Sequence, residues 1–159
     1  MSTEAAPQTT SSPARPRITL HLVSLVLVAV GLFISGYLSY VKLANTATVC
    51  LQGGAFNCEV VTHSVYSRFL GIDIAYLGFI MYLTVGILLL LENRVPFLRD
   101  YGFALEFGII LFAWLFSMWL VYVQFFLLQA LCPWCLAHET NMTILFIVTL
   151  LRLRKILLA

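Results

Sequence analysis

The residues best suited to chemistry are four cysteines, which fall into two close pairs. Cys132 and Cys135 enclose a proline and a tryptophan in the motif Cys-Pro-Trp-Cys. Pro133 suits the first turn of a helix, where its missing N–H costs nothing, so we expect Cys132 at the helix N-cap and Cys135 one turn inside. Residues three apart share a helix face, which lets the two sulfurs meet. The free N–H groups and the dipole of a helix start stabilise a thiolate, so this motif predicts a redox-active pair.

The second pair, Cys50 and Cys58, has seven residues between its members, and Gly53 and Gly54 are among them. A loop of this length with two glycines can close into a disulfide and can also bend. A mobile pair beside a fixed pair predicts a relay. Partner thiols would reduce the loop pair, which would then reduce the pair in the Cys-Pro-Trp-Cys motif, each step passing through a mixed disulfide.

Two less reactive interpretations of the cysteines remain. Either pair can be a structural disulfide, in which case the chain would be a non-catalytic membrane scaffold. Four thiolates can also bind zinc, but zinc sites of that kind use two C-x2-C knuckles, and the spacing of Cys50 and Cys58 does not supply one. We therefore expect no metal site.

The elements that must hold these cysteines are set by an apolar composition. Apolar residues make up 62% of the chain and charged residues only 10%, against about 25% charged residues in a typical soluble domain. A soluble domain of this size cannot bury so much apolar surface, so the sequence predicts an all-α membrane protein, a bundle of four transmembrane helices in a lipid bilayer. Stretches long enough to cross ~30 Å of hydrocarbon cover residues 18–43, 74–91, 103–128 and 133–151.

The three predicted regions of the chain differ in composition. Residues 1–17 are rich in Ser, Thr, Ala and Pro without apolar periodicity, and we expect a disordered cytoplasmic tail. Residues 18–151 would form the transmembrane redox domain, and 152–159 a basic cytoplasmic tail. Nothing in these regions resembles a basic patch suited to nucleic acid.

The orientation of the bundle follows from the positive charges, which accumulate on the cytoplasmic side of membrane proteins. Only Lys42 and Arg68 fall outside under a topology with both termini in the cytoplasm. The remaining basic residues fall inside: Arg15, Arg17, Arg94, Arg99, Arg152, Arg154 and Lys155. This arrangement predicts a protein of the inner or plasma membrane with all four cysteines on the extracytoplasmic side, which favours disulfides.

The first outer loop, residues 44–73, is long enough to contain structure of its own. A short helix on the mouth of the bundle would have on one face Val60, Val61, Ser64, Val65 and Phe69. The Cys-Pro-Trp-Cys pair would lie at the same mouth, where a lipid-soluble quinone can reach Cys135 from the bilayer. Quinone is the acceptor that keeps the bacterial periplasm oxidising, so a quinone would complete the relay.

Taken together, these motifs resemble the bacterial form of the vitamin K epoxide reductase family. The resemblance covers about residues 18–151 and rests on Cys50, Cys58, a serine six positions later at Ser64, and Cys132-Pro-Trp-Cys135 opening the last of four spans. The combination of both pairs on one side of four spans is specific, whereas Cys-X-X-Cys alone would not be.

The resemblance implies a role for each of these residues. Cys132 and Cys135 would be the active-site pair beside the quinone, with Cys135 reacting with quinone and Cys132 exchanging with the loop. Cys50 and Cys58 would be the shuttle pair, and Ser64 would lie on a short helix that caps the quinone pocket. The implied activity is that of a DsbB-like thiol:quinone oxidoreductase, which reoxidises a separate thioredoxin-fold (DsbA-like) protein and reduces ubiquinone or menaquinone.

The chain departs from the animal members of this family at two positions. They have Asn at the start of the second span, where this chain has Ile74 beside Asp73, and Tyr four residues after the second active-site cysteine, where it has Glu139. Both differences favour oxidation of a thioredoxin-fold partner. Reduction of vitamin K epoxide by the same cysteines is the alternative. An assay that supplies the epoxide with a dithiol would distinguish the two activities.

Several other polar residues are weaker candidates. His63 and His138 lie near the outer face as possible acid–base groups, although solvated interfacial histidines are commoner. Polar residues within spans are functional candidates in general, yet Glu139 and Asn141 lie close enough to the helix start for interfacial solvation. We expect Asp73 to cap the second span; Glu106 would lie at the cytoplasmic interface.

Overall fold

The structure is a computed structural model that describes residues 15–50, 53–92 and 94–158. Residues 1–14 of the expected tail lie outside the described residues. Four long helices form a bundle: α1 (Arg15–Ala44), α3 (Ile74–Leu91), α4 (Pro96–Tyr122) and α5 (Pro133–Leu157). Each contains a segment long and apolar enough to cross a membrane. The all-α fold with four transmembrane helices is therefore confirmed, and the protein is an integral membrane protein.

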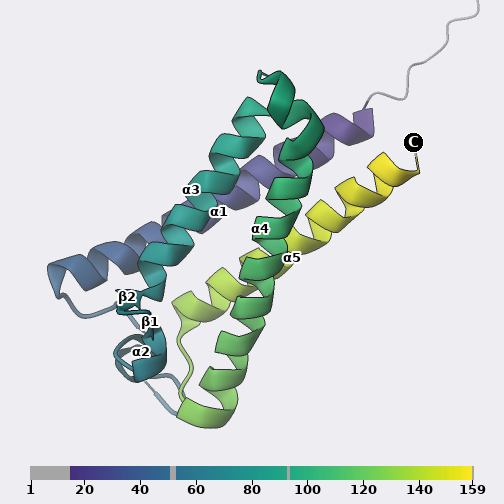
Figure 1. The fold of residues 1–159 in the computed structure, drawn as a ribbon. Coiled ribbons are helices and arrows are strands. Elements are labelled where there is room, and N and C mark those ends of the chain that lie inside the picture. Colours follow the sequence, from purple (N-terminus) through teal and green to yellow (C-terminus); the bar gives the residue numbers. More distant parts are fainter. Residues whose placement is uncertain (1–14, 51–52, 93, 159) are drawn as a thin grey trace, which may run out of the picture.

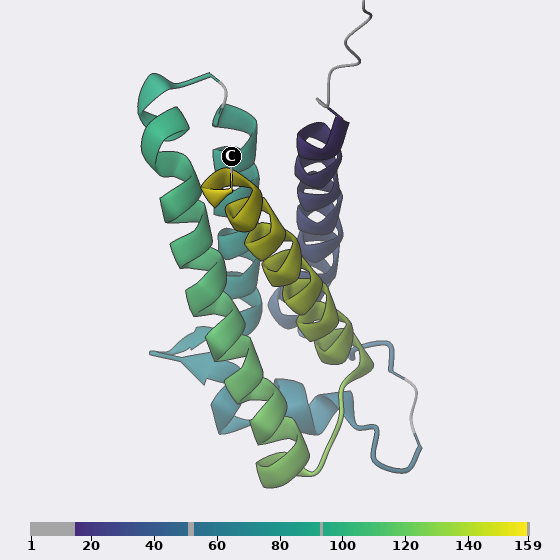
Figure 2. The same ribbon diagram turned by 90° about the vertical axis from the view of Figure 1, so that its right-hand side faces the viewer.

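The bundle has one end made of loops and small elements and another made of helix ends. At the first end lie α2 (Cys58–Thr62), the 3-10 turn η1 (Val65–Ser67) and a two-stranded ribbon of β1 (Arg68–Phe69) and β2 (Ile72–Asp73). Figures 1 and 2 show the start of α1, the α3–α4 turn and the end of α5 together at the opposite end. Both cysteine pairs therefore lie at one end of the molecule.

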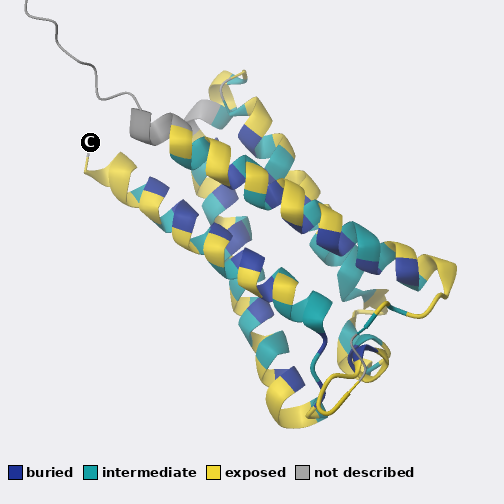
Figure 3. Ribbon diagram, turned by 180° about the vertical axis from the view of Figure 1, so that it is seen from behind, coloured by how far each residue is buried: buried dark blue, intermediate teal, exposed yellow. Residues whose placement is uncertain are grey.

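The core of the bundle lies where α1 and α4 pack on α3 and α5. Tyr82 is fully buried there and contacts Gly31, where any added Cβ would overlap the tyrosine ring. Outward-facing side chains are large and apolar; Phe33 and Phe112 are each 71% exposed, and Figure 3 shows such exposed positions along the outside of the helices. Lipid is the solvent that makes this surface stable.

α4 and α5 extend furthest beyond the stretches predicted from hydropathy, and α1 extends by a few residues. α4 begins at Pro96, because proline suits the first turn of a helix, and it ends in a π-helical turn, η2 (Val123–Leu128). α5 continues to Leu157, so much of the expected C-terminal tail is helical. Arg152, in this segment, is buried rather than solvated, because two carboxylates of neighbouring helices pair with it.

Arg152 forms a buried ionic cluster at the end of the bundle away from the cysteines. Its guanidinium donates to Glu106 at 2.8 Å and to Glu92 at 2.9 Å. Glu106 is only 2% exposed, so its carboxylate is enclosed by the protein at this end of the bundle. His21 lies 3.7 Å from Glu92, and Phe103 lies under the guanidinium. The cluster thus joins α1, α4 and α5 to the end of α3.

We predict that Arg152→Ala destabilises the protein because it leaves a buried carboxylate without its counter-charge. Breaking a buried ion pair from one side costs roughly 3 kcal/mol or more. The measurement is the thermal unfolding midpoint of the detergent-solubilised protein. Arg154→Ala is the matched control, because Arg154 is exposed on the same helix end and its loss removes the same charge. Equal midpoints for the two variants would contradict a structural role of the cluster.

Candidate functional site

The start of α5 has the geometry that its sequence predicts. Pro133 occupies the first turn, and Cys132 is the N-cap, with an extended backbone and a sulfur that accepts from the backbone N–H of Cys135 at 3.4 Å. The two thiols are not bonded to each other. Cys132 is fully buried, whereas Cys135 is partly exposed.

This environment lowers the pKa of Cys132 from its ordinary value of 9.0 to about 7. The main cause is the hydrogen bond from the Cys135 thiol; the backbone N–H groups of Cys135 and Trp134 add to it, and burial opposes it. These donors stabilise negative charge on the sulfur, as expected at a helix start. Cys132 is therefore the member of the pair poised as a thiolate near neutral pH.

The loop pair is held against this helix start by backbone hydrogen bonds. Cys50 and Cys58 form a disulfide with an S–S distance of 2.02 Å, and Cys58 opens α2. Leu131, the residue before Cys132, donates to the carbonyl of Ala55 at 2.9 Å and accepts from the N–H of residue 57 at 3.0 Å. These bonds make a short bridge between the loop and the segment leading into α5.

A second attachment involves the tryptophan of the motif. The indole N–H of Trp134 donates to the carbonyl of Val49 at 2.8 Å. The N–H of Val49 donates to the Tyr37 hydroxyl at 3.1 Å, and the Tyr37 and Trp134 rings lie 4.5 Å apart. Because Val49 precedes Cys50, these contacts fix one side of the disulfide while the bridge at Leu131 fixes the other.

The outcome is a single sulfur-containing cluster at one end of the bundle. Cys58 and Cys132 are buried in it together, and Cys50 and Cys135 pack against them. A hollow on the outer side of the loop exposes the disulfide region and is lined by Cys50, Gly53, Gly54, Phe56 and Cys58, among others. The two dithiols that the sequence singles out thus meet in space.

Cys135 also lines a cavity of about 400 Å³ inside the bundle. The walls come from all four long helices, and residues 58–73, which we call the lid, close the outer end. Ser64 also lines the cavity. Its hydroxyl donates to the carbonyl of Val61 at 2.9 Å, so part of its role is to satisfy the end of α2. A volume of this size suits a small organic ring.

The lid differs from the single helix expected from its apolar spacing. α2 ends at Thr62; Ser64 is extended, and Val65 and Phe69 belong to η1 and β1. The reason is local hydrogen bonding, because Ser64 caps the Val61 carbonyl and Ser67 donates to the Ser64 carbonyl at 2.7 Å. Such side-chain bonds compete with helix continuation.

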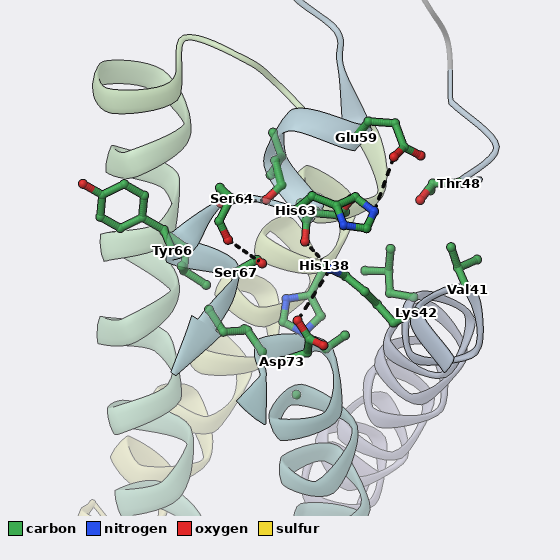
Figure 4. Close-up of a pocket in the computed structure, with 18 of the residues that line it drawn as sticks. Val41, Lys42, Thr48, Glu59, His63, Ser64, Tyr66, Ser67, Asp73 and His138 are labelled. Carbon is green, nitrogen blue, oxygen red and sulfur yellow. Dashed lines mark hydrogen bonds and ion pairs between the residues drawn. The ribbon is translucent and has the colours of Figure 1, made fainter. Parts of the chain in front are cut away.

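Charged residues tie the lid to the bundle. The Lys42 ammonium at the end of α1 donates to the carbonyl of Thr62 and lies 3.5 Å from the Asp73 carboxylate. Asp73 stands at the N-cap position of α3, as expected, but its side chain makes no capping hydrogen bond. Its carboxylate faces Lys42 and also Arg68, at 3.6 Å. Figure 4 shows Lys42 reaching across to Asp73 beneath the lid.

Three further polar residues line the cavity, and sequence reasoning gave them little or no weight. Glu139 is only 6% exposed, and His138 Nδ1 lies 3.5 Å from its Oε1. Gln124, in the π-helical turn, accepts from the N–H of Cys132 at 3.4 Å. π-Helical turns often occur at functional sites. In the sequence, the only indication of this group was the spacing of four residues between Cys135 and Glu139, which places both on one face of a helix.

The remaining candidates have structural partners. Asn141 donates to the Tyr82 hydroxyl at 3.0 Å and to the Leu27 carbonyl at 3.1 Å, which explains its burial. His63, on the lid, lies 3.4 Å from Glu59 and is well exposed. Among the residues that the structure describes, no group of three or more metal-binding side chains is found.

We predict that the reduced protein shows a thiolate that titrates near pH 7. A lowered pKa means that the Cys132 thiolate is present above pH about 7 and is protonated below it. The measurement is the ultraviolet thiolate absorbance of the reduced, detergent-solubilised protein against pH.

Two variants make this titration specific. Cys132→Ser should remove the signal. Cys135→Ala should move its midpoint upward, because the thiol of Cys135 is the principal donor to the Cys132 sulfur. A midpoint near the ordinary cysteine value in the unaltered protein would contradict the description of this helix start.

Comparison with known families agrees with the fold and the cysteine geometry. A model of the family described as "Vitamin K epoxide reductase family" matches residues 22–150. The matched region includes both cysteine pairs, the lid and all four long helices except the first turns of α1 and the last turns of α5. The protein therefore belongs to the vitamin K epoxide reductase family, a family of membrane oxidoreductases.

Proposed function

We propose that the protein is a thiol:quinone oxidoreductase that reoxidises an extracytoplasmic thioredoxin-fold partner and so supports disulfide formation. The observation that carries this proposal is the packing of both cysteine pairs in one cluster, with Cys135 on a cavity and the loop disulfide on an outer hollow. Electrons can pass between two dithiols only when their sulfurs come into contact.

The positions of the four sulfurs favour one order of exchange. The outer hollow gives a partner thiolate access to Cys50, and attack there frees Cys58. Cys58 is buried beside Cys132, so Cys58 is the loop thiolate that attacks the oxidised Cys132–Cys135 pair. That attack leaves a Cys58–Cys132 mixed disulfide and a free Cys135 thiol. The partner's second thiol then displaces Cys50 and leaves as the oxidised partner, and the freed Cys50 attacks Cys58 and releases Cys132. The result is a closed loop disulfide and a reduced pair at α5, which is the redox state in the structure.

The cavity beside Cys135 is the proposed quinone site. Lys42, Ser64, Gln124 and His138 are among the polar residues that line it, and most of its exposed lining surface is apolar, as in pockets for small organic ligands. A quinone there would take two electrons and two protons from the reduced pair. We propose ubiquinone or menaquinone as this acceptor.

The proposed orientation follows the positive charges, with both termini in the cytoplasm and both cysteine pairs outside. The bundle ends agree with it, since Arg94 and Arg154 lie at the end that contains the α3–α4 turn and the end of α5. The loop disulfide would then face the compartment in which disulfides persist.

We predict that the loop cysteines are needed for a protein donor and that Cys135 is needed for every donor. In membranes, the double variant Cys50→Ser/Cys58→Ser should lose quinone reduction by a reduced thioredoxin-fold protein, down to the uncatalysed background. It should keep quinone reduction by a small dithiol, which can reach the α5 pair directly. Cys135→Ser should abolish both activities, and quinone absorbance measures them.

The controls separate this activity from its alternatives. A scaffold with structural disulfides would show no quinone reduction in the unaltered protein. An epoxide reductase would convert vitamin K epoxide with a dithiol faster than it reduces quinone with the protein donor. Full activity of Cys135→Ser would contradict the proposed electron path.

A further inference from the structure

Glu139 is a carboxylate in an unusual position, inside a membrane-spanning helix and beside the proposed quinone site. It is 6% exposed and lines the same cavity as Cys135. Within the described part of the chain, its Oε2 atom has no hydrogen-bond partner. A buried carboxylate with an unpaired oxygen is costly in a membrane and is more often retained for function than for stability.

The helix geometry places this carboxylate close to the reacting sulfur. Glu139 follows Cys135 by four residues on α5, so the two side chains lie on one face, one turn apart. His138 is next to it on the cavity wall, with Nδ1 3.5 Å from Oε1. One carboxylate oxygen is thus held by the histidine, while the other has no partner among these residues and is available to a proton.

We propose that Glu139 accepts the proton of the Cys135 thiol and delivers it to a quinone oxygen, with His138 holding the carboxylate in place. This inference rests on the proposed function and assigns the proton path within it. Quinone reduction needs two protons as well as two electrons, and a group placed beside the reacting sulfur is the direct way to move at least one of them inside the bundle.

The protons and electrons balance without any further reagent. The S–H bond of Cys135 breaks, its proton moves to Glu139, and the Cys132–Cys135 bond forms as two electrons leave the sulfurs for quinone. Glu139 returns its proton to one quinone oxygen. The second proton is the one that Cys132 released on becoming a thiolate, and it returns through water at the cavity mouth to the other oxygen. Dithiol and quinone become disulfide and quinol.

The other titratable groups around the cavity have partners or lie at its outer end. Lys42 and Asp73 face each other across the lid attachment, and Glu59 and His63 pair on the exposed lid. The Tyr82 hydroxyl accepts from Asn141. Tyr66 comes from the 3-10 turn of the lid. Among these groups, only Glu139 is buried in α5 on the same helix face as Cys135, and the partly exposed His138 lies next to it.

The test separates the quinone half-reaction from the donor half-reaction. Full-length protein in detergent is reduced, mixed rapidly with a soluble short-chain quinone, and followed by quinone absorbance. Glu139→Gln keeps the shape of the side chain but cannot accept the proton. We expect this half-reaction to slow on the order of 100-fold with a solvent deuterium isotope effect at least as large as that of the unaltered protein, because proton transfer then limits the rate. Exchange between the loop disulfide and a reduced thioredoxin-fold donor should keep its rate.

Two variants complete the design. Glu139→Asp retains a carboxylate and should recover part of the lost rate. Thr140→Val is the control on the same helix, because Thr140 is exposed and its hydroxyl bonds only its own helix; it should react as the unaltered protein does.

Each other outcome counts against the inference. Glu139→Gln at the unaltered rate would overturn the proton path and leave the thiol:quinone activity standing. Equal slowing of donor exchange and quinone reduction, or no recovery with Glu139→Asp, would show a structural role only and would also overturn it. Absence of quinone reduction in the unaltered protein would overturn the proposed function together with the inference.

Discussion

Two backbone hydrogen bonds of Leu131, to Ala55 and from residue 57, join the first outer loop to the segment that leads into α5. The redox arrangement depends on them because the loop and the last helix are far apart in sequence and have no other backbone connection of this kind in the described residues. Side chains of Trp134 and Tyr37 reinforce the same contact through Val49. With the loop in this position, Cys58 and Cys132 share one buried cluster, and disulfide exchange becomes a local event.

The two ends of the bundle use charge in different ways. At the end away from the cysteines, Arg152 pairs with two carboxylates and joins the helices, so its charges are compensated within the protein. At the cysteine end, Lys42 ties the lid to α3 through Asp73, while Glu139 keeps an oxygen without a protein partner. Fully paired charges suit a structural role, whereas a carboxylate with one unpaired oxygen beside a reactive sulfur suits proton transfer.

Much of the architecture was predictable because it depends on local signals. Apolar length alone indicated the four spans, and the Cys-Pro-Trp-Cys spacing predicted the N-cap position of Cys132. The Arg152–Glu106 pair was not predictable, since hydropathy treats charges near a span end as interfacial and carries no information on which helices meet. The lid was also missed in part, because the apolar spacing that favours a helix was opposed by the hydroxyl of Ser64. The sequence marked Glu139 only as a polar residue within a span; the structure adds that it lines the same cavity as Cys135.

The attachment of Trp134 to Val49 has a consequence for observing the protein at work. The indole sits between the two sulfurs of its motif in sequence and is bonded to the residue that precedes the first loop cysteine. Movement of the loop during exchange would break that bond and separate the indole from the Tyr37 ring. Trp114 is stacked on Phe146 within the bundle, and Trp119 lies on the outer surface of α4, so neither would sense the loop. Intrinsic fluorescence therefore offers a label-free optical signal of loop opening, located at the active-site helix itself.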